Sequence, residues 1–359
     1  MSSVGLSKNE RLALYGLVRH PSLNDRELAG ELDLKMSTLT AIRNRLKRQG
    51  FYRTVRIPYL ERLGGELLIV THMRLNILRQ PEEVQRALRE VLGAIDDVFF
   101  AFSDLHQLMT FSLCRNYTDA WMDAEHVQQQ LSERNALAAR PVRRQTMIFP
   151  LNQTKVLRFF DFSRILGLLY GIEEEEPPQP VSLRLERFEP RELSRIEKRV
   201  YMGLVRFPDL ADNDIAKKIG VTRQSVTKIR KRLEAERLIA TARVPNLLKT
   251  GLEILAMAHY EAATSVTLST RKKGIEWVVK EMPSFFHVAG QREGVIMGLA
   301  SGYHEFQQRL FDVSRVYIEK GYFKDEPALY MLSLQDLVIV KDFSFAPMVK
   351  KVLQLRDEK

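Results

Sequence analysis

An internal repeat constrains the fold of this sequence more than any other feature. At an offset of 187 residues (193 − 6), "LSKNERLALYGLVRHPSLNDRELAGEL" from Leu6 aligns without a gap with "LSRIEKRVYMGLVRFPDLADNDIAKKI" from Leu193. The match continues through Pro58/Pro245 and Gly64/Gly251, and roughly one third of about sixty positions are identical. A match of this length predicts a tandem duplication of one unit.

Beyond the aligned region, both copies keep one order of strand-like and helix-like segments. The first copy reads "ELLIVTHMRL", "PEEVQRALREVLGAI", "DVFFAF", "QLMTFSLC", "TDAWMDAEHVQQQLSER" and a last strand near "RRQTMIFPL". The second reads "EILAMAHYEA", "STRKKGIEWVVKEM", "SFFHVAG", "GVIMGLA", "YHEFQQRLFDVSRVYIEKG" and "PALYMLSL". This order predicts a ferredoxin-like β-α-β-β-α-β module in each copy. The tripeptide "DFS", at Asp161 and again at Asp342, predicts that the tails behind the modules also correspond.

The start of each copy predicts three short helices and a strand. In the second copy, Ser194, Asp212 and Thr222 are the expected N-caps, and Pro208 and Gly220 are the expected stops. The third helix carries the apolar stripe Val226, Ile229 and Leu233, matched by Leu39, Ile42 and Leu46 in the first copy. Three helices of these lengths, followed by the strand-like "LIATARVP" or "FYRTVRIP", predict a winged helix-turn-helix in each copy.

The predicted fold class is therefore α+β, with two winged helix-turn-helix domains, each followed by a ferredoxin-like module, in tandem. Four consecutive glutamates and four prolines between the copies predict a semi-extended linker. The expected boundaries are 1–63 and 191–250 for the helix-turn-helix domains, 64–172 and 251–359 for the modules, and 173–190 for the linker.

The outward faces of the third helices and the wings carry amide, hydroxyl and cationic side chains, which suit DNA base edges and phosphates. A Lys- and Arg-rich helix is commonly only a solvated face, but here the pattern occurs twice beside a basic wing. The DNA-binding candidates are Ser37, Thr38, Thr40, Ala41, Arg43, Asn44, Lys47, Arg48, Arg53, Arg56, Arg223, Gln224, Ser225, Thr227, Lys228, Arg230, Lys231 and Arg243.

Charge and composition favour the same partner. The formal net charge is +10 and the sequence pI is about 9.6, which favours polyanions such as nucleic acid. One cysteine, Cys114, excludes an internal disulfide, and no apolar run approaches the roughly 18 residues of a membrane span. A cytoplasmic protein without a membrane partner is expected.

With "ELAGELDLKMSTLTAIRNRLKRQG" and "DIAKKIGVTRQSVTKIRKRLEAERLI" each leading into such a module, the chain resembles the leucine-responsive regulator (Lrp/AsnC) family. The resemblance implies a transcriptional regulator, archaeal in style, that reads two half-sites of double-stranded promoter DNA. It also implies an intrachain pseudo-dimer and leaves a further homodimer open. Family members often bind a small-molecule effector near the turn between the second and third module strands. The corresponding polar residues here are Ser103, Asp104, Gln291 and Arg292.

Enzymatic motifs are absent: the sequence has no HExxH, no P-loop, no GxGxxG after a strand and no nucleophile elbow. We therefore expect no catalytic residue, no metal and no cofactor. His72 and His259, aligned on the first module strands, are expected in the core or an interface. Two alternatives stay open. Siroheme decarboxylases resemble these regulators in architecture and act on a tetrapyrrole with histidine and arginine, although their DNA-reading helix tends to be degenerate. A protein-interaction scaffold could instead use the aromatic runs "RFFDFS" and "KDFSFAP".

Overall fold

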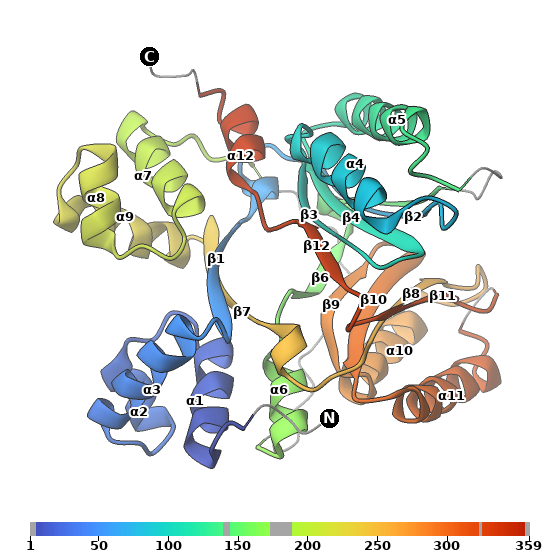
Figure 1. The fold of residues 1–359 in the computed structure, drawn as a ribbon, viewed down its shortest axis with the longest axis horizontal. Helices are drawn as coiled ribbons and strands as arrows, with labels where there is room; N and C mark the ends of the chain where they lie inside the picture. Colours follow the sequence, from blue (N-terminus) through green and yellow to red (C-terminus); the bar gives the residue numbers. More distant parts are fainter. Residues whose placement is uncertain (1–4, 139–143, 173–188, 323–324, 356–359) are drawn as a thin grey trace. The chain divides into compact units, whose positions relative to one another are not determined.

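The structure, a computed structural model, describes residues 5–138, 144–172, 189–322 and 325–355 as a mixed α+β fold (Figure 1). The chain divides into two compact units, and each unit joins three separate stretches of sequence. Unit 1 comprises Met1–Thr54, Thr154–Leu185 and Thr241–Gln335, and unit 2 comprises Val55–Gln153, Glu186–Ala240 and Asp336–Lys359. The predicted boundaries, in contrast, follow one another along the chain, and residues 173–188 of the predicted linker lie outside the described part.

Unit 1 combines the first three helices with the second module. Its helices and strands are α1 (Lys8–Arg19), α2 (Asp25–Glu31), α3 (Met36–Arg48), β6 (Lys155–Phe159), α6 (Ser163–Tyr170), β8 (Ile254–Glu261), α10 (Leu268–Glu281), β9 (Ser284–Ala289), β10 (Glu293–Ala300), α11 (Tyr303–Glu319) and β11 (Ala328–Ser333), with the short 3-10 helix η3 (Leu247–Lys249). The sheet order is β11-β8-β10-β9-β6.

Unit 2 combines the second set of three helices with the first module. Its helices and strands are β2 (Leu67–Arg74), α4 (Pro81–Gly93), β3 (Val98–Ser103), β4 (Gln107–Cys114), α5 (Tyr117–Glu133), β5 (Gln145–Pro150), α7 (Arg195–Arg206), α8 (Asp212–Ile219), α9 (Arg223–Ala235), β12 (Val338–Lys341) and α12 (Ala346–Val352), with the 3-10 helices η1 (Leu60–Arg62) and η2 (Leu151–Gln153). The sheet order is β12-β3-β4-β2-β5. The remaining strands, β1 (Tyr52–Pro58) and β7 (Ile239–Pro245), form a two-stranded sheet, and the division between the units falls within both of them.

The predicted β-α-β-β-α-β order is confirmed in both copies, and the shared element order makes the fold compatible with ferredoxin-like modules. The two copies also share their strand registers. In unit 2, Met73 pairs with Leu108 and Ala101 pairs with Thr110. At the corresponding positions of unit 1, Tyr260 pairs with Gly294 and His287 pairs with Ile296. The paired positions of one module therefore have structural counterparts in the other.

Each sheet gains its fifth strand from the tail that follows the other module in the sequence. Strand β6 follows the first module but pairs with β9, and β12 follows the second module but pairs with β3. Aromatic stacking holds both tails: Phe162 lies on Phe285 with ring centroids 4.6 Å apart, and Phe345 lies on Phe99 at the same distance. The two aromatic runs are thus core, which removes the main support for a docking surface.

The tails correspond, but in a different alignment from the one that "DFS" predicts. Val156 pairs with Val288 as Ile339 pairs with Phe102, and Phe160 and Phe343 both have a left-handed backbone, with φ of 52° and 40°. The matching offset is therefore 183 residues (339 − 156), not the 181 (342 − 161) that aligns the two tripeptides.

The helices begin and end close to their predicted positions. Ser194 and Glu197 form a capping box at α7, and the Thr222 hydroxyl accepts a hydrogen bond from the Ser225 amide at 3.1 Å. The predicted cap at Asp212 is wrong, because Ala211 is the N-cap of α8 and the Asp212 carboxylate is engaged elsewhere. Both apolar stripes of the third helices are buried, as predicted.

A histidine, tyrosine and arginine cluster as the candidate functional site

Three polar side chains lie between the sheet of unit 1 and its two module helices; two of them are buried and the tyrosine is partly buried. Tyr260 is on β8, His287 on β9 and Arg271 on α10. Ala258, two residues before Tyr260, and Ile296, the cross-strand partner of His287, pack against Val278 of α10 and Tyr317 of α11. Alternation along a strand and pairing across strands place Tyr260 and His287 on this same helix-covered face.

Tyr260 and His287 form a hydrogen-bonded pair. The phenol oxygen lies 3.2 Å from His287 Nε2, and the two rings meet edge to face. Gly294 makes room for this contact, since a Cβ built there would lie 2.2 Å from the Tyr260 hydroxyl oxygen. The pair therefore depends on a glycine at a position where a side chain would displace the phenol.

His287 is uncharged at neutral pH. Its side chain has no exposed surface, and its Nδ1 has no hydrogen-bond partner. Burial, with a smaller effect from the Arg158 guanidinium, lowers the pKa of His287 to about 3. A neutral imidazole next to a phenol can accept a proton at one nitrogen while it donates at the other.

Arg271 is a buried cation without an acidic partner among the described residues. It is 7% exposed, its guanidinium donates to the carbonyl of Gly290, and its Nε atom has no partner. Burial lowers its pKa, and the charge of nearby Arg292 acts in the same direction. Buried charges in proteins are normally paired, so an unpaired guanidinium here suits an anionic ligand group.

The same positions in unit 2 are apolar. Tyr260, Arg271, His287 and Gly294 correspond to Met73, Val84, Ala101 and Leu108, from the shared register and from equal places on α10 and α4. These four counterparts belong to one buried apolar cluster. The module therefore folds without the polar residues, which points to a function for them in unit 1.

An apolar pocket lies on the same face of the unit 1 sheet. Small residues of β8 and β10 leave the space, and α11 closes one side of it. Its lining includes Ala256, Ala258, Ile296, Gly298, Phe306 and Leu310, together with Arg309. Arg309 is ion-paired with Glu305 at 2.8 Å. Tyr260, Arg271 and His287 are not among the residues that line this pocket, which is therefore separate from the polar cluster.

The residues predicted for an effector lie in two different settings. Ser103 is fully buried and accepts a hydrogen bond from Gln85, while the Asp104 carboxylate accepts the amides of His106 and Gln107. Asp104 therefore stabilises the β3–β4 turn, whereas Ser103 joins the end of β3 to α4. Gln291 and Arg292 are exposed in the β9–β10 turn, whose Gly290 carbonyl binds Arg271. An effector role for the four stays a prediction.

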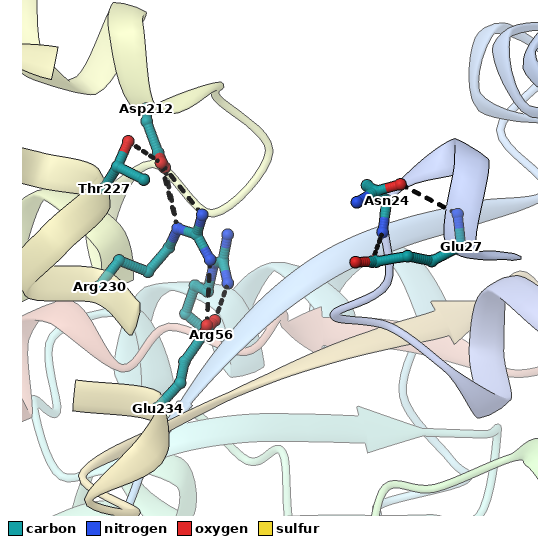
Figure 2. A network of polar contacts seen from close by, with 7 residues as sticks. All are labelled: Asn24, Glu27, Arg56, Asp212, Thr227, Arg230 and Glu234. Atoms are coloured by element: carbon teal, nitrogen blue, oxygen red, sulfur yellow. Dashed lines mark hydrogen bonds and ion pairs between the residues drawn. The ribbon is translucent and has the colours of Figure 1, made fainter. Parts of the chain in front are cut away.

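Several DNA-binding candidates are engaged within their own unit. Figure 2 shows the Asp212 carboxylate accepting from Thr227 at 2.7 Å and from Arg230 at 3.0 Å. Glu234 accepts from both Arg230 and Arg56 at 3.0 Å. Burial alone would raise the pKa of Asp212, but hydrogen bonds from Arg230 and Thr227 hold it below its usual range.

Unit 1 repeats this arrangement. Asp25 accepts a hydrogen bond from Thr40 at 2.7 Å and is ion-paired with Arg43. Figure 2 shows the neighbouring capping box of α2, which Asn24 and Glu27 form. The carboxylates of Asp25 and Asp212, at the start of α2 and α8, thus hold these helices against α3 and α9. They do so through threonine and arginine side chains that the sequence predicts to contact DNA.

The other candidates differ in exposure. Arg243 donates to the carbonyl of Leu17 at 3.0 Å, and Ser225 belongs to the cap of α9. Thr38 and Arg53 are partly buried. The exposed candidates are Ser37, Ala41, Asn44, Lys47, Arg48, Arg223, Gln224, Lys228 and Lys231. DNA contact by these residues stays a prediction.

His72 and His259 are buried, on the sheet face opposite the cluster. His72 Nε2 lies 3.0 Å from a Gln107 oxygen, and His259 Nε2 lies 3.0 Å from a Glu293 oxygen. Among the described residues, no group of three or more His, Cys, Asp or Glu side chains is placed to hold a metal ion. No described helix is long and apolar enough to cross a membrane.

No protein-family model and no curated protein matches the chain. Among solved structures, the siroheme decarboxylase NirDL is 13% identical, with a TM-score of 0.51 over 97% of this chain and 98% of its own. NirDL in complex with an iron-uroporphyrin III analogue is 12% identical, with a TM-score of 0.52 over 97% and 99%. An AsnC family transcriptional regulator from Agrobacterium tumefaciens is 16% identical over 39% of this chain and 90% of its own, with a TM-score of 0.31.

These comparisons correct two predictions. The chain shares its fold over 97% of its length with an enzyme, whereas the regulator matches 39% of it. The prediction of a DNA-binding regulator that is not an enzyme is therefore contradicted. Nothing supports the expected archaeal origin or promoter DNA as a partner.

Proposed function

We propose that this protein is an enzyme of the siroheme-decarboxylase kind, which removes a carboxylate from an acidic iron tetrapyrrole. The observation that carries the proposal is the polar cluster of unit 1, a buried Arg271 without an acidic partner beside the neutral His287 and Tyr260. The full-length fold similarity to NirDL supports it.

The cluster offers the groups that such a reaction needs. Decarboxylation breaks a C–C bond, releases CO₂ and leaves an electron pair on the substrate carbon, which must then take up one proton. The Tyr260 hydroxyl can supply that proton while His287 hydrogen-bonds to the resulting phenolate, and a proton from solvent restores the tyrosine. Arg271 suits a peripheral carboxylate that stays on the macrocycle, because a guanidinium binds carboxylates with paired hydrogen bonds.

We also propose that α1–α3 with β1, and α7–α9 with β7, are winged helix-turn-helix units of the Lrp/AsnC type with a structural role in this chain. The carboxylate clamps at Asp25 and Asp212 support this role, because they use the threonine and arginine that would otherwise face outward.

The test is a decarboxylation assay under anaerobic conditions, with siroheme as substrate and mass spectrometry of the tetrapyrrole as readout. We expect product lighter by CO₂ with the wild type, and at least a hundredfold slower reaction for His287→Gln or Tyr260→Phe, in line with the usual contribution of a proton-transfer group. His126→Gln, an exposed histidine on α5, is the matched control and should react like the wild type. Wild-type protein that releases no CO₂ from siroheme would refute the proposal.

A further inference from the structure

The turn between β9 and β10 in unit 1 has the same backbone arrangement as the turn between β3 and β4 in unit 2. The same amide-to-carbonyl hydrogen bonds hold both turns: Gly290 to Glu293 at 2.8 Å and Ala262 to Arg292 at 2.6 Å in unit 1, and Asp104 to Gln107 at 3.1 Å and Leu75 to His106 at 2.8 Å in unit 2. The matching offset is 186 residues (290 − 104), which makes Gly290 the counterpart of Asp104 and Arg292 the counterpart of His106.

In unit 2 a carboxylate of the chain itself fills this turn. One oxygen of Asp104 accepts hydrogen bonds from the amides of His106 and Gln107, at 2.7 and 2.8 Å. Successive backbone amides that converge in this way form a small anion-binding site. Unit 1 has Gly290 at the place of Asp104, and among the described residues neither the Arg292 amide nor the Glu293 amide has an acceptor. The turn of unit 1 therefore keeps the donors and lacks the carboxylate.

Two guanidinium groups lie at this turn in unit 1. The buried Arg271 donates to the Gly290 carbonyl, and its Nε atom has no partner. Arg292 is exposed, and it is close enough for its charge to act on Arg271. The counterparts in unit 2 are Val84 and His106. Relative to unit 2, this turn has one carboxylate fewer and two guanidinium groups more, which is the change that an external anion requires.

The acidic side chains next to the turn do not replace Asp104. Alternation along β8 and β10 places Glu261 and Glu293 on the face of the sheet opposite Arg271. Glu293 lies on that face 3.0 Å from His259 Nε2. The two guanidinium groups and the two amides are thus left to a carboxylate from outside the chain.

We propose that this turn binds a carboxylate of the substrate, at the place that the Asp104 carboxylate has in unit 2. The amides of Arg292 and Glu293 hydrogen-bond to one oxygen, and the guanidinium groups of Arg271 and Arg292 balance the charge. Gly294 of the candidate site follows the turn directly, so the bound carboxylate anchors the substrate beside the cluster. That the carboxylate belongs to an acidic tetrapyrrole rests on the proposed function, whereas the anion site itself does not.

Gly290→Asp tests the site, because it supplies the carboxylate from the chain itself. The matching turn of unit 2 accommodates aspartate at this place, so the variant should unfold at a temperature no lower than that of the wild type. Absorbance titration with iron uroporphyrin III should show binding weaker by about tenfold or more, as loss of charge-assisted hydrogen bonds predicts. Gly290→Ala leaves the amides open and should bind like the wild type.

Two charge variants complete the titration. Arg292→Gln should weaken binding about threefold, as loss of an exposed charge does. Lys273→Gln removes an exposed cation of α10, two residues beyond Arg271 and on another face of the helix, and should bind like the wild type. The proposal is overturned if folded Gly290→Asp binds as tightly as the wild type, or if Gly290→Ala binds as weakly as Gly290→Asp.

Acetate separates the anion site from the tetrapyrrole. In protein labelled with nitrogen-15 arginine, the Arg292 amide is assigned by its absence from the Arg292→Gln spectrum. Acetate should shift this resonance in the wild type and leave it in place in Gly290→Asp. Absence of the shift in the wild type would overturn the anion site, even in an active enzyme. A shift with acetate in a protein that neither binds nor decarboxylates a tetrapyrrole would instead overturn the proposed function and support a small carboxylic acid as the ligand.

Discussion

At the scale of single residues, Gly294 sets the geometry of the candidate site. Replacing it with alanine would put a methyl group 2.2 Å from the Tyr260 hydroxyl and 2.8 Å from the Val288 carbonyl. We expect Gly294→Ala to lose about 1–3 kcal/mol of unfolding free energy, as overpacked sites do, and to break the contact between Tyr260 and His287. Denaturant unfolding and the siroheme assay check this. Gly30→Ala, on α2 with nothing within 4 Å of the new Cβ, should leave activity intact and not destabilise. Equal effects of the two substitutions would contradict the steric argument.

His287 should also make the protein sensitive to acid. Its pKa of about 3 in the folded state lies below the usual value near 6.5, so the unfolded chain binds more protons between these two pH values. Stability should therefore fall as the pH drops from 6.5 towards 3, by up to about 1.4 kcal/mol per pH unit from this one group. His287→Gln should flatten the dependence of unfolding free energy on pH over this window. A slope identical to that of the wild type would mean that His287 is not buried in its neutral form.

The sequence alone does not predict the cluster, because its three residues differ between the two copies. Histidines matched between the two copies point instead to His72 and His259. The signal that points to the cluster is a difference between the copies. Tyr260, Arg271 and His287 occupy the positions of Met73, Val84 and Ala101 in the first copy. The position of Arg158 opposite His287 could not be predicted from the sequence, because it depends on β6, a strand that pairs outside its own copy.

At the scale of elements, the carboxylates that clamp the second and third helices should matter for stability. Asp212 binds Thr227 and Arg230, which in turn shares Glu234 with Arg56 (Figure 2). We expect Asp212→Ala to cost about 2 kcal/mol of unfolding free energy, because it removes the acceptor of the Thr227 hydroxyl and leaves the partly buried Arg230 with Glu234 as its remaining acidic partner. The lowered pKa of Asp212 means that this contribution is present above about pH 4 and is lost as the pH falls through the folded-state value.

Denaturant unfolding at neutral and acid pH measures both effects. Asp214→Ala, on the same helix but half exposed and 4.0 Å from Lys217, should change stability by less than about 0.5 kcal/mol. If the two aspartate variants unfold alike, the clamp does not stabilise α8 against α9.

Local patterns predicted the elements well because their causes are local. Apolar spacing at three and four residues identifies α9 and its buried stripe, and the capping box of Ser194 identifies the start of α7. The cap at Asp212 was wrong because its partners, Thr227 and Arg230, come from another helix. The DNA-binding role of Thr227 and Arg230 was predicted for a related reason: their place on a basic helix is visible in the sequence, whereas their contact with Asp212 of α8 is not.

At the scale of the whole molecule, the duplicated chain does not fold as two consecutive halves. The tail behind each module completes the sheet of the other one, so that each unit draws on both halves of the sequence. Sequence comparison cannot show this, because the repeat is the same whether a tail pairs with its own module or with the other. The exchange places Arg158 opposite His287 in unit 1 and lets Lys341 donate to the Leu92 carbonyl at the end of α4 in unit 2.

Deleting residues 336–359 tests the exchange. The deletion removes β12 from the edge of β3, and it removes Phe343 and Phe345 from their stacks on Phe100 and Phe99, at 4.3 and 4.6 Å. We expect hydrogen exchange to accelerate in β3 of unit 2, because its edge amides lose their partners, and to stay slow in β9 of unit 1, which keeps β6. If the tail paired instead with the module that precedes it, β9 would lose protection and β3 would keep it.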